Sequence, residues 1–184
     1  MTHNEYIIIY APYVITKLKG KKLFPSVMMA QAIIESSSRN GIAGGSVLAS
    51  KYNNHFGIKA DTSWKGKKVD LNTKEFVDGV IRSVKASFRV YEYAHLSFDD
   101  RIKFLVANKR YQKGGVFEAL DPHQQTLALQ RSGYATDPSY ASRLMAVINR
   151  YGLERLDGIS SDFYRAVNRI WSPGEMTPQV LSQV

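Results

Sequence analysis

The stretch PSVMMAQAIIES, residues 25–36, decides how the chain folds. It begins with Pro25, which suits the first turn of a helix because its missing N–H would be unpaired there anyway. Apolar side chains then recur at spacings of three and four residues, which predicts a helix with a broad buried face. Small polar residues and glycines follow, so we expect the helix to end near Ser36. The apolar face is formed by Val27, Met29, Ala30, Ile33 and Ile34.

Further helices are predicted before and after this stretch. Residues 4–19 carry apolar side chains at helical spacing, and the same spacing recurs at Phe98, Ile102 and Leu105, where Ser97 is expected to cap the helix. Asp121-Pro122 and Asp137-Pro138 each predict an N-cap followed by proline in the first helical position.

The middle of the chain follows a different pattern. Between residues 65 and 93 the apolar side chains alternate with polar ones, which predicts two or three antiparallel strands, with Asp78-Gly79 as a turn signal. Helices around a small sheet give an α+β fold class, mainly helical. After Asp157-Gly158 a tail follows, in which residues 163–171 could form one amphipathic helix.

The composition excludes several kinds of chemistry. The chain has 184 residues and no cysteine, so it has no disulfide framework, thiolate metal site or cysteine nucleophile. Its four histidines have no metal-ligand spacing, and we expect neither a metal nor an organic cofactor. No apolar run is long enough to span a membrane. The net charge of +9 suits nucleic acid, an anionic membrane or an anionic wall polymer, or simply a solvated basic surface.

Carboxylate chemistry remains, and Glu35 is the first candidate. It falls at the carboxyl end of the apolar helix, where the helix dipole and the neighbours Ile33 and Ile34 both favour the protonated acid. A glycosidase needs such an acid to protonate the leaving oxygen. Gln31, one turn earlier on the same face, could bind substrate or orient Glu35. The alternative is that Glu35 is an ordinary solvated helix end.

Three motifs then occur in a fixed order, and they are specific as a set. The first is AQAIIES (30–36), followed closely by GSVLA (45–49); the second is YNNHFGIK (52–59), and the third is GYATDP (133–138). Four shorter stretches lie between the second and the third: WKG (64–66), TKE (73–75), FRVY (88–91) and LQ (129–130). Over about residues 24–157 the chain resembles the bacterial endo-β-N-acetylglucosaminidases of the flagellar-muramidase and autolysin type, glycoside hydrolase family 73.

This resemblance implies a lysozyme-like fold, in which a helical lobe and a small antiparallel β-lobe flank a groove for a glycan strand. It implies cleavage of the β-1,4 bond between N-acetylglucosamine and N-acetylmuramic acid in peptidoglycan. Glu35 matches the catalytic acid, Glu75 the second carboxylate of the β-lobe, and Tyr134 a tyrosine near the reacting sugar. Residues 1–157 would then be the catalytic domain and residues 158–184 a C-terminal tail.

Each of these assignments has a structural alternative. Glu75 could be a solvated strand residue, with Asp78 competing for its role, and Tyr134 could pack in the core. Asn54 and Phe56 could bind the sugar or close the turn between the lobes, and Trp64 could stack on a sugar or anchor the β-lobe. Asp137 could reach the substrate, although it is well placed to cap a helix at Pro138.

One segment departs from the family pattern. Many relatives read Glu-Ser-Gly-Trp-Gly after the catalytic acid, whereas this chain reads Glu35-Ser36-Ser37-Ser38-Arg39, with its glycines at Gly41, Gly44 and Gly45. The wall of the groove beside Glu35 therefore lacks that tryptophan.

Other readings compete with the hydrolase. They are a lytic transglycosylase or muramidase on the same fold, a non-catalytic cell-wall-binding module, and a nucleic-acid binder suggested only by charge. For the hydrolase, retaining, inverting and substrate-assisted routes are all open. We expect a monomer that acts on the wall, outside the cytoplasm or in the periplasm, on peptidoglycan and not on nucleic acid. No signal peptide is visible in the chain.

Overall fold

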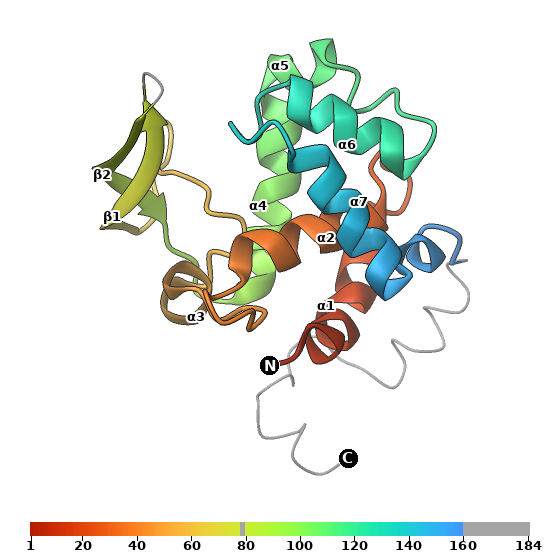
Figure 1. Ribbon diagram of the computed structural model, residues 1–184, viewed down its shortest axis with the longest axis horizontal. Coiled ribbons are helices and arrows are strands. Elements are labelled where there is room, and N and C mark those ends of the chain that lie inside the picture. Colours follow the sequence, from red (N-terminus) through yellow and green to blue (C-terminus); the bar gives the residue numbers. More distant parts are fainter. Residues whose placement is uncertain (78–79, 160–184) are drawn as a thin grey trace.

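The computed structural model describes residues 1–77 and 80–159, except for the side chains of residues 74–77 and 81. Helices pack around one central helix, and a two-stranded hairpin stands to one side of them (Figure 1). In chain order the elements are α1 (His3–Leu18), α2 (Pro25–Ser36), α3 (Val47–Tyr52), β1 (Lys68–Val77), β2 (Val80–Arg89), α4 (Ala94–Ala107), α5 (Lys109–Lys113), α6 (Pro122–Arg131), α7 (Tyr140–Tyr151) and the 3-10 helix η1 (Leu153–Leu156).

Helix α2 is the centre of the helical part, and the helix predicted from its sequence is confirmed. It contacts α1, α6, α7 and η1. Because helices pack around it, it is buried on nearly all sides, and Val27, Met28, Met29 and Ala30 have no exposed surface.

The first turn of α2 receives its cap from a distant part of the chain. Phe24, at the N-cap position, gives no side-chain hydrogen bond. Instead Asp157, which directly follows η1, accepts hydrogen bonds from Ser26 N at 2.8 Å and from Ser26 Oγ at 2.6 Å. The end of the predicted domain therefore closes onto the start of its central helix.

The predicted sheet is a hairpin of two antiparallel strands, with a register that runs from Lys68 opposite Arg89 to Val77 opposite Val80. A third segment adds only an isolated bridge between Lys59 and Phe88. Arg89, at the end of β2, binds both carboxylate oxygens of Asp100 on α4, at 3.1 and 2.9 Å. This ion pair, in which Nη1 alone donates to both oxygens, ties the hairpin to the helical part.

Two predicted helix starts are wrong. Helix α4 begins at Ala94, before Ser97, whose Oγ donates to Ala94 O inside the helix instead of capping it. Helix α7 begins at Tyr140, because Pro138 and Ser139 form a turn in which Asp137 accepts a hydrogen bond from Ser139 N. The predicted cap at Asp121 is confirmed, with Gln124 N as donor.

Two short helices, α3 and α5, were not predicted, because neither is long enough to show a helical period. The predicted tail helix at residues 163–171 and the turn at Asp78-Gly79 lie outside the described residues. Within the part that is described, no helix is long and apolar enough to cross a membrane.

Candidate active site

Glu35 lies in the last turn of α2, half-buried, with one carboxylate oxygen held by a neighbouring helix. The hydroxyl of Tyr140, the first residue of α7, donates to Glu35 Oε1 at 2.9 Å. Burial raises the pKa of Glu35, while the bond from Tyr140 and the positive charge of Arg143 work against that shift. The direction is the one a general acid needs.

Gln31 lies beneath Glu35 with no exposed surface. Its Nε2 donates to Tyr140 OH at 3.0 Å, and its Oε1 accepts a hydrogen bond from Arg101 Nη2. Both ends of the amide are therefore engaged inside the protein, which favours the orienting role over contact with substrate.

Tyr134 is brought close to Glu35 by the turn between α6 and α7. Its ring stacks on that of Tyr140, with centroids 5.7 Å apart and planes 15° from parallel. Burial and the nearby carboxylate of Glu35 raise the pKa of its hydroxyl, so Tyr134 remains a neutral donor. The side chain is partly exposed and also packs against the core, and its place beside the reacting sugar stays a prediction.

Glu75 lies in β1, where its backbone pairs with Arg82 of β2. Its side chain is outside the described part of the structure, as is Asp78, its predicted competitor. The separation of the Glu35 and Glu75 carboxyl groups therefore stays a prediction.

Asn54 and Phe56 close the turn between the helical part and the hairpin. The Asn54 amide donates to Ile58 O at 3.0 Å and to Arg89 O at 2.9 Å, and its oxygen accepts from Ile58 N. Phe56 packs edge-on against Phe98 in the core. Both side chains are buried, which supports the turn-closing alternative.

Trp64 and Asp137 are both engaged within the protein. Trp64 donates through Nε1 to Lys67 O at 2.9 Å, and the Arg89 guanidinium lies over its ring at 4.7 Å. It is partly exposed, so it anchors the β-lobe and keeps some free surface. Asp137 accepts from Ser139, as described above, and from Arg143 Nη1 at 2.8 Å.

The serine-rich loop after Glu35 folds back beside the end of α2. Ser36 Oγ accepts a hydrogen bond from Gly44 N at 3.0 Å, and Ser36 O accepts one from Ser46 N at 2.8 Å. Gly44 has a φ of +67°, and a Cβ there would lie 3.3 Å from the Tyr6 ring. The displaced glycine is therefore needed for the loop to pass over α1.

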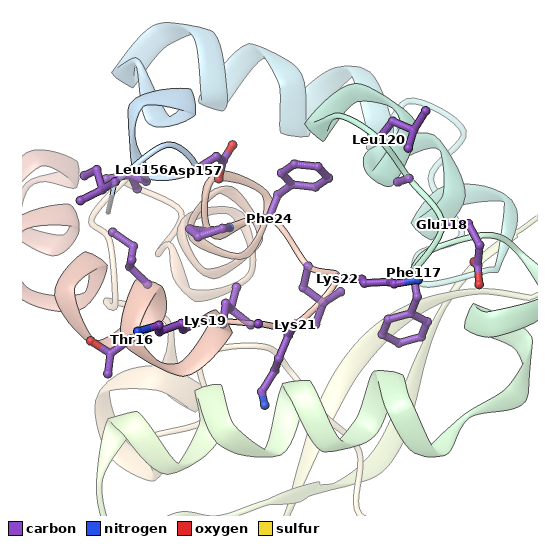
Figure 2. A pocket seen from close by; sticks show the side chains of 17 residues that line it. Thr16, Lys19, Lys21, Lys22, Phe24, Phe117, Glu118, Leu120, Leu156 and Asp157 are labelled. Atoms are coloured by element: carbon purple, nitrogen blue, oxygen red, sulfur yellow. The ribbon is translucent and has the colours of Figure 1, made fainter. Parts of the chain in front are cut away.

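A pocket of about 750 Å³ lies on another part of the molecule, and Figure 2 shows it between the α1–α2 loop, residues 117–120 and residues 156–159. Lys19, Lys21 and Lys22 project around it, and Asp157 lies in its wall. Glu35 is not among its lining residues, so this pocket is not the predicted glycan groove.

Sequence reasoning missed Tyr140 and Arg101 as members of the site. Tyr140 has helical spacing to Leu144 and Ile148, which indicates core packing and not a site. Arg101 lies on the same helical face as Phe98, Ile102 and Leu105, so a charged residue at a predicted core position was the signal that could have found it.

Known proteins of the same kind share this fold. The catalytic domain of the autolysin Auto from Listeria monocytogenes superposes with a TM-score of 0.70 at 34% identity, over 84% of this chain and 87% of that one. The chain is also 37% identical over 141 residues to the exo-glucosaminidase LytG of Bacillus subtilis, covering 75% of this chain and 48% of LytG. A probable N-acetylmuramidase of Lactococcus lactis is 37% identical over 144 residues, 76% of this chain and 31% of that protein.

Fold and relatives together define a glycoside hydrolase domain of lysozyme-like architecture. The family model of the glucosaminidases, described as mannosyl-glycoprotein endo-β-N-acetylglucosaminidase, matches residues 11–153. The chain belongs to this glucosaminidase family. It spans less than half the length of the curated relatives named above.

Proposed function

We propose that the protein hydrolyses the β-1,4 bond between N-acetylglucosamine and N-acetylmuramic acid in peptidoglycan, with Glu35 as general acid. The observation that carries the proposal is the setting of Glu35: a half-buried carboxyl group at a helix end, with a raised pKa and one oxygen held by Tyr140. A carboxyl group that keeps its proton near neutral pH can protonate the oxygen of the leaving sugar. Tyr134 would lie beside the same sugar.

Glu75 is the proposed second carboxylate. It would act as nucleophile at a carboxyl separation of about 5 Å, or activate a water at about 6.5–9.5 Å, while the substrate's acetamido group is the third candidate. The anomeric configuration of the first product separates inversion from retention. Retention together with loss of activity in Glu75→Ala would show that Glu75 takes part, and a covalent glycosyl-enzyme on Glu75, detected by mass spectrometry, would assign the nucleophile to Glu75 and not to the acetamido group.

Which glycosidic bond this protein cleaves has to be measured, because one relative is a glucosaminidase and another is a probable muramidase. Purified peptidoglycan is digested and the soluble fragments are identified by mass spectrometry after reduction. New reducing ends on N-acetylglucosamine support the proposal. Reducing N-acetylmuramic acid indicates a muramidase, and an anhydro-muramic product indicates a lytic transglycosylase.

The role of Glu35 is tested with Glu35→Gln, which keeps the size of the side chain and removes the acidic proton. We expect kcat to fall about 100-fold or more while binding to insoluble wall persists. Glu118→Gln is the matched control, because Glu118 is an exposed carboxylate at the separate pocket. Near-normal turnover by Glu35→Gln would contradict the proposal, and wall binding without turnover in the unmodified protein would indicate a binding module.

We infer that the protein acts on the wall, outside the cytoplasm or in the periplasm, and its net charge of +9 suits the anionic groups of that polymer. Lys65, Lys67 and Lys68 are exposed at the base of the hairpin, where peptide carboxylates of the wall could meet them. Binding to wall should weaken as salt rises. The alternative that the charge binds nucleic acid is tested by a filter-binding assay at moderate salt, in which we expect no retention of nucleic acid. Sedimentation tests the proposal that the protein is a monomer.

A further inference from the structure

Three hydrogen bonds run in series to Glu35, from α4 to α2, on to α7 and back to α2. Arg101 donates through Nη2 to Gln31 Oε1, Gln31 donates through Nε2 to Tyr140 OH at 3.0 Å, and Tyr140 donates to Glu35 Oε1 at 2.9 Å. Gln31 and Arg101 have no exposed surface, so water does not compete for these bonds.

The direction of this series is set at its first member. A guanidinium has only donors, so Gln31 must turn its amide oxygen toward Arg101 and its NH₂ toward Tyr140. The Tyr140 oxygen accepts from that NH₂, and its single hydrogen is then free for Glu35. Without a fixed donor the amide could rotate by 180°, and Tyr140 could donate to Gln31 instead of Glu35.

We propose that Arg101 is a positioning residue that, through Gln31 and Tyr140, commits Glu35 Oε1 to accept a hydrogen bond and so leaves the proton of the acid on Oε2. This inference rests on the proposed role of Glu35 as general acid. Oε2 accepts no hydrogen bond from the described residues, so it is the oxygen that can deliver the proton to a sugar.

The burial of Arg101 argues against a purely stabilising role. Its Nε and Nη1 are buried and have no hydrogen-bond partner within the described residues. Burial lowers the pKa of Arg101, although the hydroxyls of Tyr134 and Tyr140 oppose this shift. A buried cation with unpaired donors costs free energy of folding, and an apolar side chain of similar length would pack there without that cost.

The test compares Arg101→Met, which removes the donor, with Arg101→Lys, which keeps a donor-only cation. Lys103→Met, at an exposed position of the same helix, is the control for loss of one positive charge. For each protein kcat, KM and their dependence on pH are measured on peptidoglycan fragments, and the titration of Glu35 is followed by ¹³C NMR. The groups facing Glu35 that stay unchanged throughout are Tyr134, Tyr140 and Arg143.

We expect Arg101→Met to lower kcat about ten-fold or more with KM within two-fold. Its pKa for Glu35 and the alkaline limb of its activity should both move to higher pH, because the carboxylate loses the bond from Tyr140. Arg101→Lys should recover most of kcat, and Lys103→Met should match the unmodified protein. An Arg101→Met protein with unchanged kcat and pH profile would overturn the inference.

A second variant covers the case in which Arg101→Met fails to fold. Gln31→Glu keeps the buried cation paired but removes the one donor that Tyr140 has among the described residues, so the same fall in kcat and the same upward shift of the alkaline limb are expected. An unchanged profile here would also overturn the inference. The two proposals fail separately: an active Glu35→Gln refutes the proposed function, whereas an inactive Glu35→Gln beside an unaltered Arg101→Met refutes only the role of Arg101.

Discussion

The Tyr140 hydroxyl lies 2.9 Å from Glu35 Oε1 and donates its hydrogen to it, although the two residues are 105 positions apart in the chain. Helices α2 and α7 pack against each other, and this bond joins the last turn of the first to the first turn of the second. The acid therefore depends on the position of α7 as well as on its own helix.

Tyr140→Phe removes this bond and keeps the ring. We expect kcat to fall about ten-fold or more, because a hydrogen bond to an ionisable group contributes about 1.5–3 kcal/mol. The alkaline limb of the pH profile should move upward, since the bond lowers the pKa of Glu35. Tyr151→Phe, near the opposite end of α7, is the control, and equal kinetics for the two variants would refute the assignment.

Glu35→Gln should make the stability of the fold less dependent on pH. Burial raises the pKa of Glu35, so between its ordinary value and the raised value the native state holds more protons than the unfolded chain. Its contribution to stability is therefore present at low pH and is lost as pH rises through that window. Urea unfolding at a series of pH values measures the free energy of unfolding. We expect this free energy to rise for the variant, relative to the unmodified protein, as pH increases. A constant difference at all pH values would show that Glu35 titrates alike in both states.

His55 makes the stability of the fold depend on pH in the opposite sense to Glu35. It is buried against Tyr6, whose hydroxyl lies 2.6 Å from Nδ1, and against Tyr10 and Phe98, and burial lowers its pKa to about 4. Because the unfolded chain binds the proton first, the fold should lose stability as pH falls from about 6.5 toward 4, by at most about 3 kcal/mol. His55→Gln should weaken this acid sensitivity, measured by urea unfolding, while His123→Gln, at an exposed position, should leave it unchanged.

Asp157→Ala should destabilise the fold by about 1–2 kcal/mol, because Ser26 loses both of its hydrogen-bond acceptors at the start of α2. Thermal unfolding measures the effect, and Asp121→Ala, which removes a single exposed cap bond from α6, should cost less.

The contact between Asp157 and Ser26 also tests the proposed domain 1–157. A chain that ends at residue 159 should keep the stability of the full chain, whereas one that ends at residue 153 should lose at least as much as Asp157→Ala. Equal stability of the two shortened chains would move the domain boundary inward.

The sequence predicted the elements whose pattern is local and long. The helix from Pro25 to Ser36 and the hairpin were predicted from spacing, and the cap at Asp121 was predicted from the residue type next to a proline. The starts of α4 and α7 were wrong because serine can bond inside a helix as well as at its end, and an Asp-Pro pair can start a turn as well as a helix.

The sequence alone identified Glu35 as the carboxyl group whose surroundings favour the protonated form. The helix end and the apolar residues that have this effect are its neighbours in the chain. Only the tertiary structure decided which groups hold that carboxyl: Tyr140, Gln31 and Arg101 belong to three helices that meet when the core closes. Packing brings these side chains together through contacts that no local periodicity encodes, and the fixed donors of a buried guanidinium then set the direction of the bonds between them.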